Sequence, residues 1–208
     1  MLNFDFMGIL YSLPGIFIGF SFHEFAHALV AYRLGDDTAK AQGRLTLDPT
    51  SHIDPMGFIM LVLFRFGWAK PVPVNPLSFK DRKVGMILVS LAGPIMNFTI
   101  AFISLLLYSL ITYKFKFNNT VIENILYITY LINLNLGVFN LIPLPPLDGS
   151  KILAGLLPVK YEYSFYKYEQ YSQILLLLLI FTNTIHIVLD PLFGIVNIAI
   201  LNIVNLII

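Results

Sequence analysis

The sequence contains no cysteine and is poor in charged residues. Without cysteine the chain has no disulfide framework, no thiolate metal site and no cysteine nucleophile. Charged residues form 12% of its 208 positions and hydrophobic residues 57%, whereas soluble domains carry about 25% charged residues. A chain this apolar cannot cover itself with polar surface in water, so its composition predicts an integral membrane protein. The formal net charge of +1 neither favours nor opposes a nucleic-acid partner, and we predict none.

Apolar runs long enough to cross a bilayer recur along the chain, since a membrane helix needs about 20 mostly apolar residues. The run from Met56 to Phe64 is too short to cross and predicts a re-entrant or interfacial segment. The last run is long enough for two passes, and Asp190-Pro191 is the natural break between them. We therefore predict an all-α integral membrane protein with about five transmembrane helices, formed by residues 7–32, 84–113, 121–147 and 172–208.

The basic residues predict the orientation, because Lys and Arg gather in cytoplasmic loops. With the N-terminus outside, the cytoplasmic loops contain eleven of the thirteen Lys and Arg residues. The outside loop between residues 114 and 120 contains the other two, Lys114 and Lys116. We expect the N-terminal segment to be retained, because it has no basic residue and no small-residue cleavage site follows it.

Two stretches between the first runs have distinct local patterns. Residues 36–54 are polar with short alternating stretches such as 43–47 (GRLTL), and they predict a small β-hairpin at the membrane surface. Residues 68–76 (WAKPVPVNP) contain three prolines, which remove backbone donors and favour an extended chain. Either stretch would offer edge-type hydrogen bonding to an unwound peptide.

The first apolar run contains His23-Glu24-Phe25-Ala26-His27, an HExxH motif. On a helix the residues i and i+4 share one face, so both imidazoles can reach one metal ion. Zinc lowers the pKa of bound water to about 7, and the Glu24 carboxylate can then take its proton. Ionisable side chains in a membrane span are costly and usually functional. The motif therefore predicts a metal site rather than polar packing between helices.

A catalytic zinc normally has three protein ligands and one open position. Because the chain lacks cysteine, the third ligand is His, Asp or Glu. Asp148 is the best candidate, since it lies at the inner end of the third run, near the same membrane face as His23 and His27. The alternative is that Asp148-Gly149 forms only a turn where the chain leaves the membrane, because Asp-Gly is a common turn signal.

Three ordered motifs resemble the signatures of the site-2 protease family of intramembrane zinc metalloproteases. HEFAH at residues 23–27 is followed by Gly93-Pro94-Ile-Met-Asn97, which resembles the family's G-P-x-x-N element. NLIPLPPLDG at residues 140–149 matches the family's N-x-x-P-x-P-x-x-D-G pattern. The order and spacing agree with the small bacterial branch of the family, which has no PDZ or CBS domain.

The resemblance implies one transmembrane peptidase domain over residues 1–208. Its three-helix catalytic core spans about residues 7–150, and helices at about 172–208 are accessory. The partners it implies are the lipid bilayer and transmembrane protein substrates, cleaved near the cytoplasmic face of a bacterial plasma membrane in regulated intramembrane proteolysis. We do not predict an oligomer.

The resemblance also implies a Zn²⁺ ion held by His23, His27 and Asp148, with Glu24 as the general base. Two rival hypotheses use these residues differently. A membrane metal transporter would bind the ion transiently, but it should have a polar path across the bilayer and often an inverted repeat. A catalytically inactive relative would hold membrane substrates without cutting them. Replacing Glu24 separates the hypotheses, because transport or holding should survive the change and proteolysis should not.

Five further residues have two interpretations each. Asn97 and Asn140 contact either the substrate or its transition state, or else a neighbouring helix. His52 is either a substrate contact or, as we favour, a surface residue that caps a turn. Gly15 and Gly19 form a GxxxG pair that favours close helix packing and, less often, dimerisation.

Overall fold

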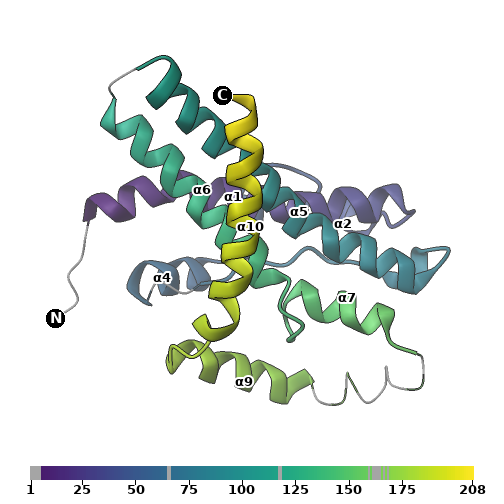
Figure 1. The fold of residues 1–208 in the computed structure, drawn as a ribbon. Helices are drawn as coiled ribbons and strands as arrows, with labels where there is room; N and C mark the ends of the chain where they lie inside the picture. The colour runs from purple at the N-terminus through teal and green to yellow at the C-terminus, as the bar shows by residue number, and fades with distance from the viewer. Residues whose placement is uncertain are drawn as a thin grey trace.

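The computed structural model describes residues 6–64, 67–116, 119–158 and 169–208, together with residues 160, 165 and 167. Over these residues the regular structure is helical (Figure 1). Among the described residues, strand-like pairing is limited to one isolated antiparallel bridge between Ile53 and Ala69. Residues 36–54, for which we predicted a small hairpin, contain short helices, turns and bends and no strand pairing with one another. Arg44 in this stretch is buried and donates from Nη2 to the carbonyl of Lys70.

Three long helices form the core of the fold by packing against one another. They are α1 (Phe6–Arg33), α5 (Arg82–Ser109) and α6 (Thr120–Asn140). A π-helical turn, η2 (Leu110–Lys114), extends α5. A fourth long helix, α10 (His186–Ile207), crosses α5 and α6 in Figure 1 and contacts both. By length and composition, these four can cross a membrane, which agrees with the predicted membrane protein.

The number of spans is the point at which the fold departs from the sequence prediction. We predicted about five, and the described residues contain four helices of sufficient length. Helix α9 (Glu169–Phe181) has 13 residues, fewer than the roughly 20 that a crossing needs. The break after it lies at residues 182–185, where Asn183 adopts a positive φ of 57°. Asp190-Pro191, the predicted break, lies inside α10: Pro191 is the sixth residue of this helix and removes one backbone donor there without ending it.

Polar side chains cap the starts of α5 and α6, and prolines follow the end of α6. Asp81 caps α5 by accepting from the amides of Lys83 and Val84, and Asn119 caps α6 in the same manner. Helix α6 ends at Asn140, immediately before the proline-rich stretch 141–147, because proline cannot continue a helix. Helix α7 (Asp148–Leu156) starts directly after that stretch.

Small residues let α1 and α6 approach closely. A Cβ added at Gly15 would lie 2.8 Å from the Cα of Thr129. A Cβ added at Gly19 would lie 2.9 Å from Oδ1 of Asn133. The GxxxG pair therefore serves helix packing within one chain, as the pattern favoured.

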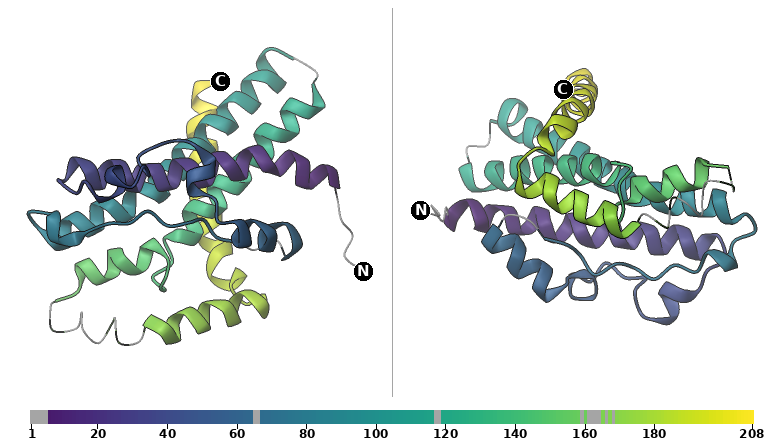
Figure 2. Two further views of the ribbon diagram at one scale, coloured as in Figure 1. Left: turned by 180° about the vertical axis from the view of Figure 1, so that it is seen from behind. Right: turned by 90° about the horizontal axis from the view of Figure 1, so that it is seen from below.

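The chain between α1 and α5 forms short elements that cover one side of the core, as the right view of Figure 2 shows. In chain order they are α2 (Thr38–Ala41), α3 (Pro49–His52), α4 (Pro55–Phe64) and the 3₁₀ turn η1 (Pro76–Ser78). Helix α4 has 10 residues, so it is too short to cross a bilayer, as its sequence predicted. An irregular segment, residues 71–75, runs along α1 toward η1.

Candidate metal centre

The two histidines of the HExxH motif lie one helical turn apart on α1. Their Nε2 atoms are 3.0 Å apart, and the two rings meet edge to face. His23, Glu24 and His27 are all buried. His27 lies six residues before Arg33, the last residue of α1, which corresponds to about 9 Å along the helix. The motif is therefore inside the core, near one end of the bundle.

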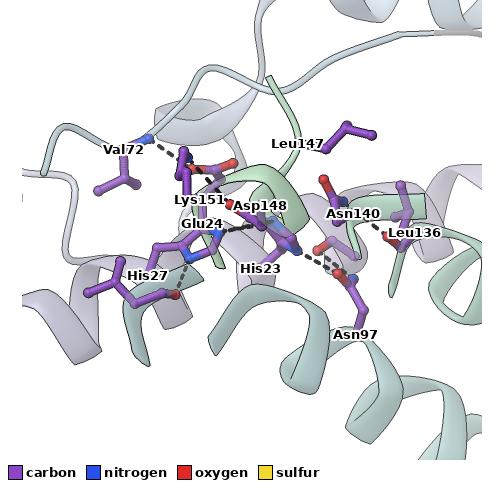
Figure 3. A network of polar contacts seen from close by, with 12 residues as sticks. His23, Glu24, His27, Val72, Asn97, Leu136, Asn140, Leu147, Asp148 and Lys151 are labelled. Carbon is purple, nitrogen blue, oxygen red and sulfur yellow. Dashed lines mark hydrogen bonds and ion pairs between the residues drawn. The ribbon is translucent and has the colours of Figure 1, made fainter. Parts of the chain in front are cut away.

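Asp148, the first residue of α7, completes a triangle with the two histidines (Figure 3). Its Oδ2 atom lies 3.1 Å from Nε2 of His23 and 3.1 Å from Nε2 of His27. Gly149 allows the chain to turn here, because a Cβ at this position would lie 2.2 Å from the carbonyl oxygen of Leu141. The structure thus brings together the three side chains that the sequence proposed as metal ligands.

The hydrogen bonds of the two imidazoles show that this triangle fits a cation. Nδ1 of His27 lies 2.7 Å from the carbonyl oxygen of Val89, which can only accept, so Nδ1 carries the proton. Nδ1 of His23 lies 2.6 Å from Oδ1 of Asn97. In the neutral rings both Nε2 atoms then present lone pairs, and they face Oδ2 of Asp148, which is buried and has no donor.

Three acceptors 3.0–3.1 Å apart repel one another unless a cation lies among them. Tetrahedral zinc with ligand distances of about 2.0–2.1 Å separates its ligand atoms by about 3.3 Å. The observed separations are close to that value. His23, His27 and Asp148 therefore fit a zinc ion, and the second nitrogen of each histidine has the oxygen partner typical of metal-binding imidazoles.

Gly93 on α5 leaves room for this centre. A Cβ added there would lie 2.6 Å from Nε2 of His23 and 2.6 Å from Nε2 of His27. These are the two atoms that face Asp148. Any side chain at position 93 would therefore occupy the space beside both nitrogen donors, which explains the glycine in physical terms.

We expect the Gly93→Ala substitution to weaken zinc binding by about 10–100-fold, the range found when groups next to metal ligands are disturbed. The added methyl group pushes both imidazoles out of line with Asp148. Zinc affinity measured by competition with a chromogenic chelator tests this expectation. Gly194→Ala on α10 is the control, because a Cβ there has no atom within 4 Å. Unchanged affinity in Gly93→Ala would contradict the proposed position of the ion.

Glu24 shares a cavity of about 300 Å³ with the three donors. Its Oε2 atom accepts a 2.8 Å hydrogen bond from the backbone amide of Val72. Pro71, Val72 and Val74 line the same cavity, so the 71–75 segment forms one of its walls. The sequence predicted an extended chain at this place, but it did not predict the bond to Glu24.

Asp36 anchors this wall to the end of α1. Its buried carboxylate accepts hydrogen bonds from the backbone amides of Thr38, at 3.0 Å, and Asn75, at 2.6 Å. The Thr38 hydroxyl also donates to it. Burial opposes ionisation, but these hydrogen bonds prevail and hold the pKa of Asp36 below its ordinary value. The charged carboxylate therefore holds the 71–75 segment in place.

We expect Asp36→Asn to lower the melting temperature at pH 7 by about 3–6 °C. This follows from about 1.5 kcal/mol for a hydrogen bond to a charged group and about 2–4 °C per kcal/mol. Because the folded-state pKa is depressed, the stabilisation is fully present above about pH 4 and declines as the pH falls further. The difference between the variant and wild type should therefore shrink toward pH 3.

Thermal unfolding followed by the fluorescence of Trp68, the single tryptophan of the chain, measures this pH dependence. Asp37→Asn is the matched control, because Asp37 is the neighbouring residue and its side chain caps no helix. An equal difference in melting temperature at pH 3 and pH 7 would show that ionisation of Asp36 is not the cause.

Lys151 is a site residue that the sequence reasoning missed. Its Nζ lies 3.4 Å from Oδ1 of Asp148, the carboxylate oxygen that does not face the histidines. Lys151 also lines the cavity, and its side chain is 45% exposed. The signal available in the sequence was the i, i+3 spacing on a helix that begins at Asp148.

The other three candidates differ in where the structure places them. Asn140 lines the cavity, and its Nδ2 donates to the carbonyl of Leu136 at 3.0 Å. Asn97 is fully buried and directs Oδ1 toward His23. His52 is also fully buried, so our expectation of a surface residue is wrong. Its Nε2 lies 2.7 Å from the carbonyl of Thr46, which satisfies a loop carbonyl inside the fold. The roles assigned to all three residues stay predictions.

Comparison with known proteins places this centre in a family. Residues 11–182 match the model of Peptidase family M50. The chain is 42% identical over 185 residues to YwhC of Bacillus subtilis, covering 87% of this chain and 84% of that protein. It is 30% identical over 179 residues to Rip2 of Mycobacterium tuberculosis, covering 84% of this chain and 68% of that protein. The names of both relatives describe zinc metalloproteases.

A longer relative is the zinc metalloprotease MJ0392 of Methanocaldococcus jannaschii. The chain is 30% identical to it over 165 residues, which cover 78% of this chain and 38% of that protein. No solved structure matches the chain significantly. The resemblance based on three motifs is thereby confirmed, and zinc is the metal of the relatives by name. The chain belongs to Peptidase family M50, a family of zinc metalloproteases.

Proposed function

We propose that this chain is an intramembrane zinc endopeptidase of the site-2 type, which cleaves transmembrane protein substrates within or near their membrane spans. The observation that carries the proposal is the buried triangle of donors from His23, His27 and Asp148, with sides of 3.0–3.1 Å. Two of the donors belong to a helix long and apolar enough to cross a membrane. A hydrolytic site at this depth is suited to peptide bonds that soluble proteases do not reach.

The residues of the cavity have different roles in peptide hydrolysis. Zinc held by the three donors supplies Lewis acidity toward the scissile carbonyl and toward water. Glu24 takes the proton of the attacking water and passes it to the leaving amine. The amide of Val72 bonds Oε2 of this carboxylate and so restricts its orientation beside the cavity.

The substrate must unwind before it is cut, because the backbone groups of a helix are bonded internally. The wall formed by residues 71–75 offers mainly backbone carbonyl oxygens to such an unwound peptide, because the amides of Val72 and Asn75 are bonded to Glu24 and Asp36. The cavity of about 300 Å³ is too small for a folded helix, whose diameter with side chains is about 10–12 Å. Local unwinding therefore explains how a short peptide segment reaches Glu24.

We propose that the protein lies in a bacterial plasma membrane with its N-terminus outside and the site toward the cytoplasm. The support comes from charge: the site lies near the bundle end that carries Arg33, Arg82 and Lys83. Basic residues gather on the cytoplasmic side. With four spans the chain keeps this orientation up to α10, because α9 is too short to cross.

Single cysteines introduced into this cysteine-free chain test the orientation. Lys40→Cys and Lys114→Cys replace exposed residues on opposite ends of the bundle. In intact cells a membrane-impermeant thiol reagent should label the second variant and not the first. Labelling of Lys40→Cys alone would reverse the orientation, and labelling of both would contradict the span arrangement.

Proteolysis itself is tested with the purified chain in liposomes and a panel of single-span substrates. Zinc-depleted protein should be inactive, and stoichiometric zinc should restore cleavage within or near the substrate span. Mass spectrometry of the products locates the cut. Cleavage confined to soluble loops, or cleavage that survives complete removal of zinc, would overturn the proposal.

A further inference from the structure

Two asparagines are completely buried among the three core helices. Asn97 lies on α5 and Asn133 on α6, and both side chains are inaccessible to solvent. Amide groups at such places in a membrane span are costly unless every donor and acceptor has a partner. Their hydrogen bonds therefore reveal what each amide is held to do.

The orientation of the Asn133 amide is determined by backbone carbonyls. Its Nδ2 donates to the carbonyl of Thr129 at 2.9 Å and to that of Gly15 at 3.3 Å. Carbonyl oxygens only accept, so the nitrogen must face them and Oδ1 must face the other way. Oδ1 of Asn133 then accepts from Nδ2 of Asn97 at 3.0 Å.

The orientation of the Asn97 amide follows from that of Asn133. Its Nδ2 also donates to the carbonyl of Gly19 at 3.2 Å, so both donors face α1 and α6. Oδ1 of Asn97 is left to face Nδ1 of His23 at 2.6 Å. Because this oxygen only accepts, Nδ1 of His23 carries the proton and its Nε2 presents a lone pair toward Asp148.

The two zinc-binding imidazoles are thus oriented in different ways. His27 is held by the carbonyl of Val89, which the backbone of α5 keeps in position. His23 is held by a side-chain amide, which could rotate by 180° and present its nitrogen instead. An amide nitrogen facing Nδ1 would favour the other tautomer and turn the Nε2 proton toward the metal. The His23 ligand therefore requires an additional restraint, and Asn133 is in a position to supply it.

We propose that Asn133 is a positioning residue of the zinc centre: through Asn97 it holds His23 in the tautomer that binds the metal. This inference rests on the proposed zinc site. It assigns to α6 a role in zinc binding although Asn133 does not contact the ligands themselves. Gly19 of α1 leaves the space that this arrangement needs, because a Cβ there would lie 2.9 Å from Oδ1 of Asn133.

The test compares zinc affinity in the full chain in detergent for Asn133→Leu and Asn135→Leu. Leucine has a similar size and no hydrogen-bonding group. Asn135 is the matched control, since it lies on the same helix, is exposed, and donates to the carbonyl four residues earlier in the same way. We expect Asn133→Leu to weaken zinc binding by about 10–100-fold, with a changed visible absorption spectrum of the cobalt-substituted protein. Asn135→Leu should leave both unchanged.

A second substitution separates positioning from helix packing. An aspartate at position 97 presents an acceptor to His23 whichever way it rotates, so it needs no orienting partner. The double variant Asn97→Asp/Asn133→Leu should therefore bind zinc at least about tenfold more tightly than Asn133→Leu, within the range for outer-shell partners. If Asn133→Leu does not fold, Asn133→Ser replaces it. The serine hydroxyl can bond the carbonyl of Thr129 but does not reach Asn97.

The inference is overturned if the Asn133 variants melt at lower temperature but keep wild-type zinc affinity and an unchanged cobalt spectrum. It is also overturned if adding Asn97→Asp to the Asn133 variant brings no recovery of zinc affinity. Failure of the proposed function gives a different result, because wild type itself would then bind no zinc in the same assay. Wild-type binding together with unaffected Asn133 variants would refute the positioning role alone.

Discussion

Replacing Glu24 with glutamine is expected to stop peptide hydrolysis while zinc stays bound. Glutamine has nearly the same volume, and its amide oxygen can still accept the hydrogen bond from Val72. It cannot take a proton from water at neutral pH. Loss of a general base typically costs about 10²–10⁴-fold in rate, so cleavage of the best substrate should fall by at least that factor. The zinc content should stay near one ion per chain, because Glu24 is not among the three donors.

Zinc content and substrate cleavage are measured on the same liposome preparations of wild type and Glu24→Gln. Glu123→Gln, in the first turn of α6, is the matched control and should behave as wild type. If Glu24→Gln cleaves at the wild-type rate, Glu24 is not the base. If both proteins bind zinc and neither cleaves any substrate of the panel, the substrate-holding or transport hypotheses gain support.

Asp148→Asn is expected to remove zinc from the protein and activity with it. The substitution replaces the anionic donor of the triangle by a neutral amide and leaves the ammonium group of Lys151, 3.4 Å from Oδ1, without its carboxylate. A positive charge beside the site then opposes cation binding. We expect zinc affinity to fall by more than about 100-fold, the upper value for changes outside the ligand shell.

Zinc retained after dialysis against a chelator measures this loss. Asp190→Asn is the control, because Asp190 is exposed on α10 and pairs only at the surface with His186, at 3.2 Å. Lys151→Met is a useful companion, since it removes the counter-charge and keeps all three donors. We expect it to retain zinc. An Asp148→Asn variant that keeps one tightly bound zinc would show that the third ligand is another residue.

Several features of this protein follow from the sequence because they depend on local chemistry. The apolar composition predicted membrane helices, and run length separated crossing segments from the short helix α4. His23 and His27 were predicted to share a face because positions i and i+4 do so on every α-helix. None of these inferences requires knowledge of which helices pack together.

The local sequence pattern gave the wrong answer at two places, the break before α10 and the burial of His52. Asp190-Pro191 looked like a break between two spans, yet α10 continues through it and the chain breaks at Asn183 instead. A proline removes only one backbone donor, and the apolar run on both sides of Pro191 continues as one helix. His52 looked like a surface residue, but the loop folds over it and buries it completely.

The sequence by itself determined the class of protein, the core helices and the set of groups able to bind zinc. Only the tertiary structure decided that Asp148 meets both histidines at 3.1 Å, that Gly93 leaves space beside them, and that Asn133 connects α6 to His23 through Asn97. The physical reason is the range of the interactions. Helix formation and i, i+4 spacing depend on neighbouring residues, whereas contacts between positions as distant as 23 and 148 exist only after the helices have packed.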